Sequence, residues 1–169
     1  MFNSGNNPSF GYCAAQKTKY FGYKLHAVCD KNGIFHSFDL SPANVHDVNY
    51  LNDVKKNLKN CLLIGDRGHI SNKFQVDLFN YSNIKLSVPM RKNQHGFVEF
   101  SRTKSKIRKR IEIAISQLGG QFSINIDFAK SFLGLATRIA SKIAYFTMIQ
   151  YLNFSDFKRS LNKTKINLC

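Results

Sequence analysis

Cys61-Leu62-Leu63-Ile64-Gly65-Asp66 is the stretch that decides the fold of this 169-residue chain. Its apolar run is too short for an ordinary helix and ends in glycine, which is typical of a parallel strand buried on both faces. Ligands collect at the carboxyl ends of such strands in open α/β sheets, so Asp66 is predicted to lie at a site of chemistry. The alternative role of Asp66 is that of a strand-end turn residue paired with Arg67.

The charge of the chain indicates a polyanionic partner. The sequence holds 25 Lys and Arg against 10 Asp and Glu, which gives a formal charge of +15 and a pI near 9.9. Nucleic acid is the simplest partner for such a surface, and an anionic membrane surface is the alternative. The four cysteines form no CxxC pair and the N-terminus lacks the pattern of a signal peptide. Reduced thiols and a cytoplasmic location are therefore expected.

The pattern of apolar residues predicts a single α/β domain, because 169 residues with 43% hydrophobic content suffice for one core. The apolar stretch from Ala129 to Leu152 contains Lys130, Arg138 and Lys142, which favours a core helix over a membrane span. The expected elements are an irregular segment over 1–19, a hairpin over 20–40 that turns at 30–33, helices over 45–58, 71–81, 107–118 and 129–152, a strand over 84–88, a basic loop from 90 to 106, a helix break at 119–120 and a mobile basic tail over 153–169.

Six of the nine residues from Arg102 to Arg110 are basic, and they lead into an amphipathic segment that carries Glu112. A solvated charge run is the usual role of such a stretch. Its place beside a carboxylate instead favours neutralisation of DNA phosphates, which positions DNA without reading its sequence. The predicted DNA-binding residues are Arg91, Lys92, Arg102, Lys104, Lys106, Arg108, Lys109 and Arg110.

Two further acids have competing interpretations. Glu112 follows Arg108 by four residues and Lys109 by three, so an ordinary ion pair on a helix surface is the alternative to a role in chemistry. Asp47 with His46 is the composition of a metal pair, but capping of the following helix is the favoured interpretation.

Four motifs occur in an order that resembles the DDE transposases of small bacterial insertion sequences, across residues 20–152. They are Phe21-Gly22-Tyr23-Lys24-Leu25-His26, Pro42-Ala43-Asn44-Val45-His46-Asp47, Leu63-Ile64-Gly65-Asp66-Arg67-Gly68-His69, and Arg108-Lys109-Arg110-Ile111-Glu112 with Ser116-Gln117-Leu118. The resemblance implies an α/β fold with an RNase H-like mixed sheet flanked by helices. It also implies DNA as the partner, both as insertion-sequence ends and as target.

The resemblance assigns the second catalytic aspartate to Asp66 and the catalytic glutamate to Glu112, as ligands of two Mg²⁺ or Mn²⁺ ions that cleave and transfer DNA strands. The family's first aspartate has no counterpart, because no acid precedes Asp30, which lies in the hairpin turn. We therefore expect an N-terminally truncated domain that lacks its first, central strand and is inactive alone. The alternative is a non-enzymatic remnant that binds DNA or associates with itself or with intact transposase.

Overall fold

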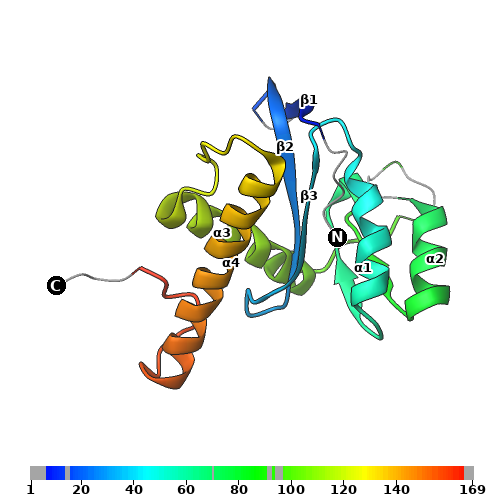
Figure 1. Cartoon of the computed structure of the whole chain (residues 1–169). Coiled ribbons are helices and arrows are strands. Elements are labelled where there is room, and N and C mark those ends of the chain that lie inside the picture. The colour runs from blue at the N-terminus through cyan, green and yellow to red at the C-terminus, as the bar shows by residue number, and fades with distance from the viewer. Residues whose placement is uncertain (1–6, 14–15, 70, 91–92, 94–96, 166–169) are drawn as a thin grey trace. The chain divides into compact units, whose positions relative to one another are not determined.

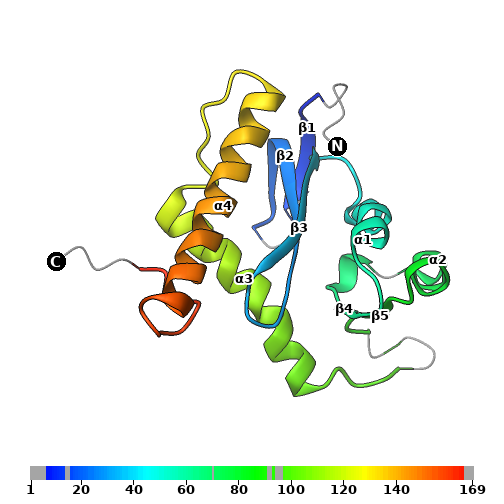
Figure 2. The same ribbon diagram turned by 60° about the horizontal axis from the view of Figure 1, so that its bottom comes forward.

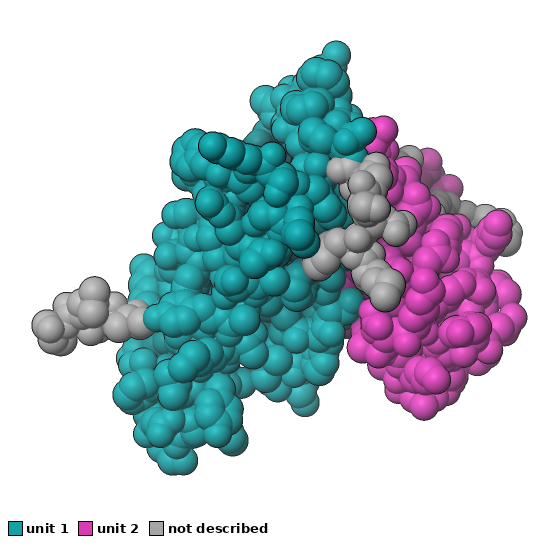
Figure 3. Space-filling model, in the orientation of Figure 1, with its two compact units in different colours: residues 1–43, 110–169 teal, residues 44–109 magenta. Residues whose placement is uncertain are grey.

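The computed structural model describes residues 7–13, 16–69, 71–90, 93 and 97–165, which divide into two compact units (Figures 1 and 3). Unit 1 consists of Met1–Ala43 and Arg110–Cys169, and unit 2 of Asn44–Lys109. In chain order the elements are β1 (Ser9–Cys13), β2 (Thr18–Cys29), β3 (Phe35–Pro42), the 3₁₀ helix η1 (Asp47–Tyr50), α1 (Leu51–Asn57), β4 (Leu62–Ile64), the 3₁₀ helix η2 (Arg67–His69), α2 (Asn72–Ser82), β5 (Lys85–Ser87), α3 (Arg102–Phe122) and α4 (Phe132–Ser155). The predicted α/β class is confirmed, and the described strands lie in two sheets, one in each unit.

The sheet of unit 1 is an antiparallel meander in the order β1-β2-β3. The predicted hairpin is confirmed between β2 and β3, where the Asp30 carboxylate accepts hydrogen bonds from the backbone N–H groups of Asn32, at 2.8 Å, and Ile34, at 3.0 Å. Gly33 has a φ of 88°, a conformation that glycine adopts without steric cost. Local turn chemistry therefore fixes this hairpin.

Strand β1 contradicts the prediction that residues 1–19 are irregular. Ser9–Cys13 pair antiparallel with the first half of β2. Gly11 is required at this place, because a Cβ on it would lie 2.8 Å from both the Ala43 Cβ and the Tyr20 ring. The prediction failed because Phe10 and Tyr12 point outward on a short strand, where the usual alternation would place polar residues.

The core of unit 1 lies between its sheet and two helices. Figures 1 and 2 show α4 and the later part of α3 on the same side of β2 and β3. Leu40 of β3, Leu118 of α3 and Phe146 of α4 belong to one buried cluster. The predicted final helix is confirmed with its start moved to Phe132, where the Ser131 hydroxyl accepts a hydrogen bond from Gly134 N at 3.1 Å.

Helix α4 also has the length and apolar composition needed to cross a membrane, and among the described residues it is the one helix that does. Lys130, which counted against a membrane span in the sequence, precedes this helix. A core helix of a soluble protein meets the same criterion, and Ile139, Ile143 and Phe146 of α4 pack in the core. Length and composition alone are therefore weak grounds for a membrane span.

The described part of the expected C-terminal tail is packed, which contradicts the prediction of a mobile segment. The Asn153 side-chain amide donates to the carbonyl oxygens of Leu161, at 3.2 Å, and Lys163, at 2.9 Å. The Gln117 amide of α3 donates to Asn162 O at 2.8 Å, and Thr164 is buried. The amide groups of buried Asn153 and half-buried Gln117 bond to backbone carbonyls and hold this segment on α3 and α4.

Unit 2 is built on the parallel pair β4-β5, with Val54 of α1, Leu78 of α2 and Ile84 fully buried. The parallel strand predicted from Cys61 to Ile64 is thus confirmed. Its burial on both faces is not, because Leu62 is 54% exposed and β5 is the one described strand that pairs with β4. The helix expected over 45–58 is divided into η1 and α1.

Helix α3 is longer than predicted at both ends. The Ser101 hydroxyl accepts a hydrogen bond from Lys104 N at 3.3 Å, so the helix begins inside the expected basic loop. It also continues through Gly119-Gly120, although each glycine costs about 1 kcal/mol relative to alanine. Burial of Leu118 and ring contacts between Phe122 and Phe146, with centroids 6.1 Å apart, offset that cost.

Candidate catalytic site and nucleic-acid surface

Asp66 lies at the carboxyl end of β4, as the sequence predicts. Gly65 N donates to Ser87 O at 3.0 Å, so the parallel pairing continues to the residue just before it. The chain then turns at once into η2. The apolar strand and the glycine that follows it therefore deliver a single carboxylate to the strand end.

Two hydrogen bonds hold the Asp66 carboxylate, and both fall on Oδ1. Gly68 N donates to it at 2.9 Å and His69 Nδ1 at 2.7 Å. The side chain is 57% exposed. Asp66 thus makes the contacts of a strand-end turn residue, and its side-chain partner is His69, whereas the sequence suggested Arg67. Both of these bonds leave the carboxylate fixed through a single oxygen.

The surroundings of Asp66 lower the pKa of its carboxyl below the ordinary value. The hydrogen bond from His69 is the largest cause; the charge of His69, the Gly68 N–H and the charge of Arg108 act in the same direction, and partial burial opposes them. An aspartate is ionised at neutral pH at its ordinary pKa, and the lowered pKa of Asp66 extends the ionised form to more acidic solution. An ionised carboxylate is the form that binds a hard cation.

Gly68 leaves room for two carboxylates. A Cβ on this residue would lie 3.2 Å from Asp66 Oδ1 and 3.6 Å from Asp47 Oδ2. Asp47 is thus a neighbour of Asp66, which sequence reasoning missed. The helix cap expected from Asp47 with His46 is supplied by His46, whose Nδ1 accepts a hydrogen bond from Val48 N at 3.4 Å. The signal for Asp47 was its place at the end of the second transposase-like motif.

The six basic residues from Arg102 to Arg110 lie on α3 and divide between two faces of it. Residues four and seven or eight apart share a helix face. Lys104 and Arg108 form one such pair: Lys104 Nζ donates to Ser87 Oγ at 3.0 Å, and Arg108 acts electrostatically on Asp66. We call the other four the basic stripe: Arg102, Lys106, Lys109 and Arg110. The first three of these are exposed.

The remaining predicted site residues are Glu112, Arg91 and Lys92. Glu112 is exposed on α3 in unit 1, one helical turn after Arg108. Arg91 and Lys92 lie outside the described residues. The structure therefore brings Asp66 together with Arg108, and it leaves the roles of the other three as predictions.

The carboxylate side chains near Gly68 are of the type that binds a divalent cation. Carboxylate oxygens are the ligands that Mg²⁺ and Mn²⁺ prefer. In the part of the chain that the structure describes, however, no group of three or more His, Cys, Asp or Glu side chains is placed to hold a metal ion. The described residues thus supply ligands of the right type, but fewer of them than a complete metal site needs.

His69→Ala is expected to raise the pKa of Asp66 toward its ordinary value, because the largest cause of its depression is removed. A depressed folded-state pKa adds stability above the unfolded value, and that stability is lost as the pH falls through the folded value. The variant should therefore lose part of this acid dependence. Titration of the Asp66 carboxyl carbon by NMR measures the shift. The same substitution at the exposed His36 is the matched control, and an unchanged Asp66 pKa in His69→Ala would contradict the assignment.

The chain matches the family model of the transposase DDE domain over residues 4–147. No curated protein and no solved structure matches it significantly. The matched region includes β1 to β5, α3 and most of α4, so it covers Asp66 and Glu112. Domains of this family have an RNase H-like fold and act in DNA transposition. The chain belongs to the transposase DDE domain family.

Proposed function

We propose that this chain binds DNA through the basic stripe and contributes Asp66 and Glu112 to metal-dependent cleavage and transfer of DNA strands during transposition of an insertion sequence. The observation that carries the proposal is the ionised, partly exposed Asp66 carboxylate at the end of β4, with Arg108 acting on it. Arg108 is also four residues before Glu112 in α3. Carboxylates that hold metal ions and cationic side chains that stabilise phosphoryl charge both serve phosphodiester chemistry.

Each group has a separate task in this proposal. His69 and Gly68 fix Asp66 by its Oδ1, which restricts the rotation of the carboxylate that would hold a cation. The basic stripe neutralises phosphates and positions the strand. Mg²⁺ or Mn²⁺, when bound, activates a water or a 3′-hydroxyl and stabilises the leaving oxygen. Asp66 and Glu112 are the ligands from this chain, as the family pattern assigns them.

A second candidate function is DNA binding without catalysis. Residues 1–169 hold no acid before Asp30, so the family's first aspartate has no counterpart among them. A protein with the basic stripe and two of three catalytic acids would occupy DNA ends, or associate with an intact transposase, without cutting. DNA binding is common to both functions and is therefore the first property to test.

DNA affinity should be salt-sensitive and largely independent of sequence. We expect log K to fall with log salt by about 0.9 for each phosphate neutralised. Replacing Arg102, Lys106 and Lys109 by Gln should flatten this slope by about two to three units. Fluorescence anisotropy with duplex DNA at several salt concentrations measures the slope.

The matched control replaces three exposed lysines elsewhere in unit 2, Lys59, Lys73 and Lys85, by Gln. It removes the same charge and should leave the slope nearly unchanged. Equal flattening by both triple variants would show that net charge acts without a defined surface. An unchanged slope in the stripe variant would show that α3 does not contact the DNA backbone.

A further inference from the structure

The hairpin of β1 and β2 presents exposed aromatic rings on one face. Phe10 is 74% exposed, Tyr12 61% and Phe21 59%. Phe10 pairs with Phe21 across the strands, with ring centroids 4.9 Å apart, and Tyr12 pairs with Lys19. Directly paired residues share a face of a sheet. We call Phe10, Tyr12, Lys19 and Phe21 the aromatic hairpin face.

The opposite face of the same hairpin is closed by the protein itself. At Gly11, between the two exposed rings of β1, a side chain would collide with Tyr20 and Ala43. The hairpin thus packs on the rest of unit 1 through this inner face. The exposed rings of the outer face take no part in that packing. Large aromatic side chains exposed in a cluster on a soluble domain mark an interaction surface.

Charge selects the class of partner for this face. Lys17 and Lys19 are exposed in the hairpin, and Lys19 lies on the same face as the rings. The sequence has no acidic residue before Asp30. Aromatic rings interleaved with lysines, without acids, complement a strand of stacked bases joined by phosphates. An apolar protein partner would need no lysines among the rings.

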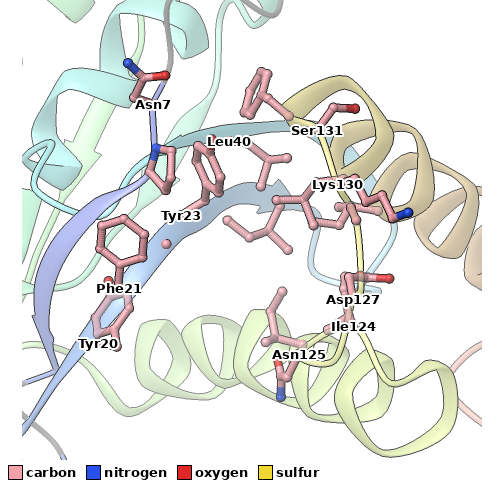
Figure 4. A pocket seen from close by; sticks show the side chains of 18 residues that line it. Asn7, Tyr20, Phe21, Tyr23, Leu40, Ile124, Asn125, Asp127, Lys130 and Ser131 are labelled. Atoms are coloured by element: carbon pink, nitrogen blue, oxygen red, sulfur yellow. The ribbon is translucent and has the colours of Figure 1, made fainter.

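A cavity of about 830 Å³ within unit 1 adjoins the aromatic hairpin face. Phe21 belongs to both, and Figure 4 shows it beside Tyr20 and Tyr23 on the strand side, with Asn125 on the opposite side. The Tyr23 and Phe132 rings lie 5.1 Å apart, and both residues line the cavity. Aromatic walls with amide groups suit a planar heterocycle, and the volume exceeds that of a single nucleobase.

We propose that the aromatic hairpin face binds unpaired bases of DNA by stacking, and that the adjoining cavity receives one of them. The inference rests on the proposed DNA binding and adds a contact to bases that the basic stripe does not supply. Stacking on aromatic rings tolerates any base, because every base has a π-face. Strand cleavage and transfer expose unpaired nucleotides at DNA ends, which gives such a surface a substrate.

The test compares two labelled oligonucleotides of about 12 nucleotides, the length of one single-strand site. One is oligothymidylate, and the other has the same backbone with every base removed. The full chain should bind oligothymidylate more tightly, at every salt concentration. Phe10→Ala and Tyr12→Ala should each weaken binding of oligothymidylate by about fivefold or more and leave the abasic strand unaffected.

The controls separate stacking from structure. Phe128→Ala removes a ring that is 85% exposed in unit 1 but outside the hairpin, and it should change neither affinity. Tyr12→Phe keeps the ring and should bind as the unaltered chain does. Circular dichroism spectra that match the unaltered chain establish that the variants are folded.

Three results would overturn this inference. Equal, salt-sensitive affinity for both oligonucleotides would refute base stacking and leave the proposed DNA binding intact. Lack of binding to either strand or to duplex DNA at low salt would refute both proposals. Loss of a dimer in sedimentation for Phe10→Ala, with unchanged oligonucleotide affinity, would assign the aromatic hairpin face to contacts between copies of this chain.

Discussion

Residues 1–169 are expected to show no DNA strand cleavage or transfer with Mg²⁺ or Mn²⁺, even on insertion-sequence ends. Two-metal chemistry needs several carboxylate oxygens to hold both cations against their mutual repulsion. The family pattern assigns two acids in this chain, Asp66 and Glu112, and the described residues contain no group of three metal-ligating side chains. A gel assay for nicked and joined strands, with duplex binding measured in parallel, tests this expectation.

Adding a first strand that carries its aspartate, taken from an intact family member and fused before Met1, should restore cleavage. In this fusion Asp66→Asn and Glu112→Gln should each reduce cleavage to background while DNA binding persists, because they remove a charge and keep the shape. Asp53→Asn, at a carboxylate 3.6 Å from Lys56, is the control and should remain active. Metal-dependent cleavage by residues 1–169 alone, lost in Asp66→Asn, would contradict the count of ligands. Asp47, beside Gly68, would then be the first candidate for the third carboxylate.

The elements that the sequence predicted well are those whose structure is decided locally. The turn from Asp30 to Gly33 contains its own hydrogen-bond acceptor and its own residue with positive φ. Strand β4 was predicted because Leu62, Leu63 and Ile64 are followed by a glycine and an acid. In both cases a few residues that are neighbours in the sequence determine the local structure.

The elements that were missed depend on distant contacts. Strand β1 forms because Gly11 fits against Tyr20 and Ala43. The pattern of apolar residues within 9–13 gives no indication of that contact. Helix α3 continues through two glycines because Phe122 packs on α4. A local propensity of about 1 kcal/mol per glycine is overridden when the next turn buries an aromatic ring.

The site shows the same division. The position of Asp66 was readable from the strand that precedes it, but the partners of its carboxylate were not. His69 and Gly68 contact Oδ1 because of the tight turn of η2, and Asp47 lies nearby because η1 packs on η2. The basic run was predicted to be a loop as far as Lys106, and its division into two faces became visible only because α3 begins at Arg102. Sequence thus located the acid, and tertiary structure supplied its surroundings.

Phe146→Ala is expected to destabilise unit 1 by about 3–5 kcal/mol. Phe146 is fully buried, and its ring lies 5.9 Å from Phe35 and 6.1 Å from Phe122, so it joins β3, α3 and α4. Truncation removes these contacts and leaves a cavity, because β3, α3 and α4 cannot all move inward to fill the space. A small domain is stable by only about 5–15 kcal/mol, so this single change takes a large part of the total. Urea denaturation followed by circular dichroism measures the loss.

Phe154→Ala, on the same helix, removes the same side chain at an exposed position and should change stability by no more than about 0.5 kcal/mol. The pair thus separates packing from helix propensity, because both substitutions gain the same propensity. Equal losses in the two variants would mean that the outer face of α4 is covered in solution. A small loss in both would mean that α3 and α4 do not pack on the sheet as described, and the aromatic hairpin face would then lose the scaffold that holds it.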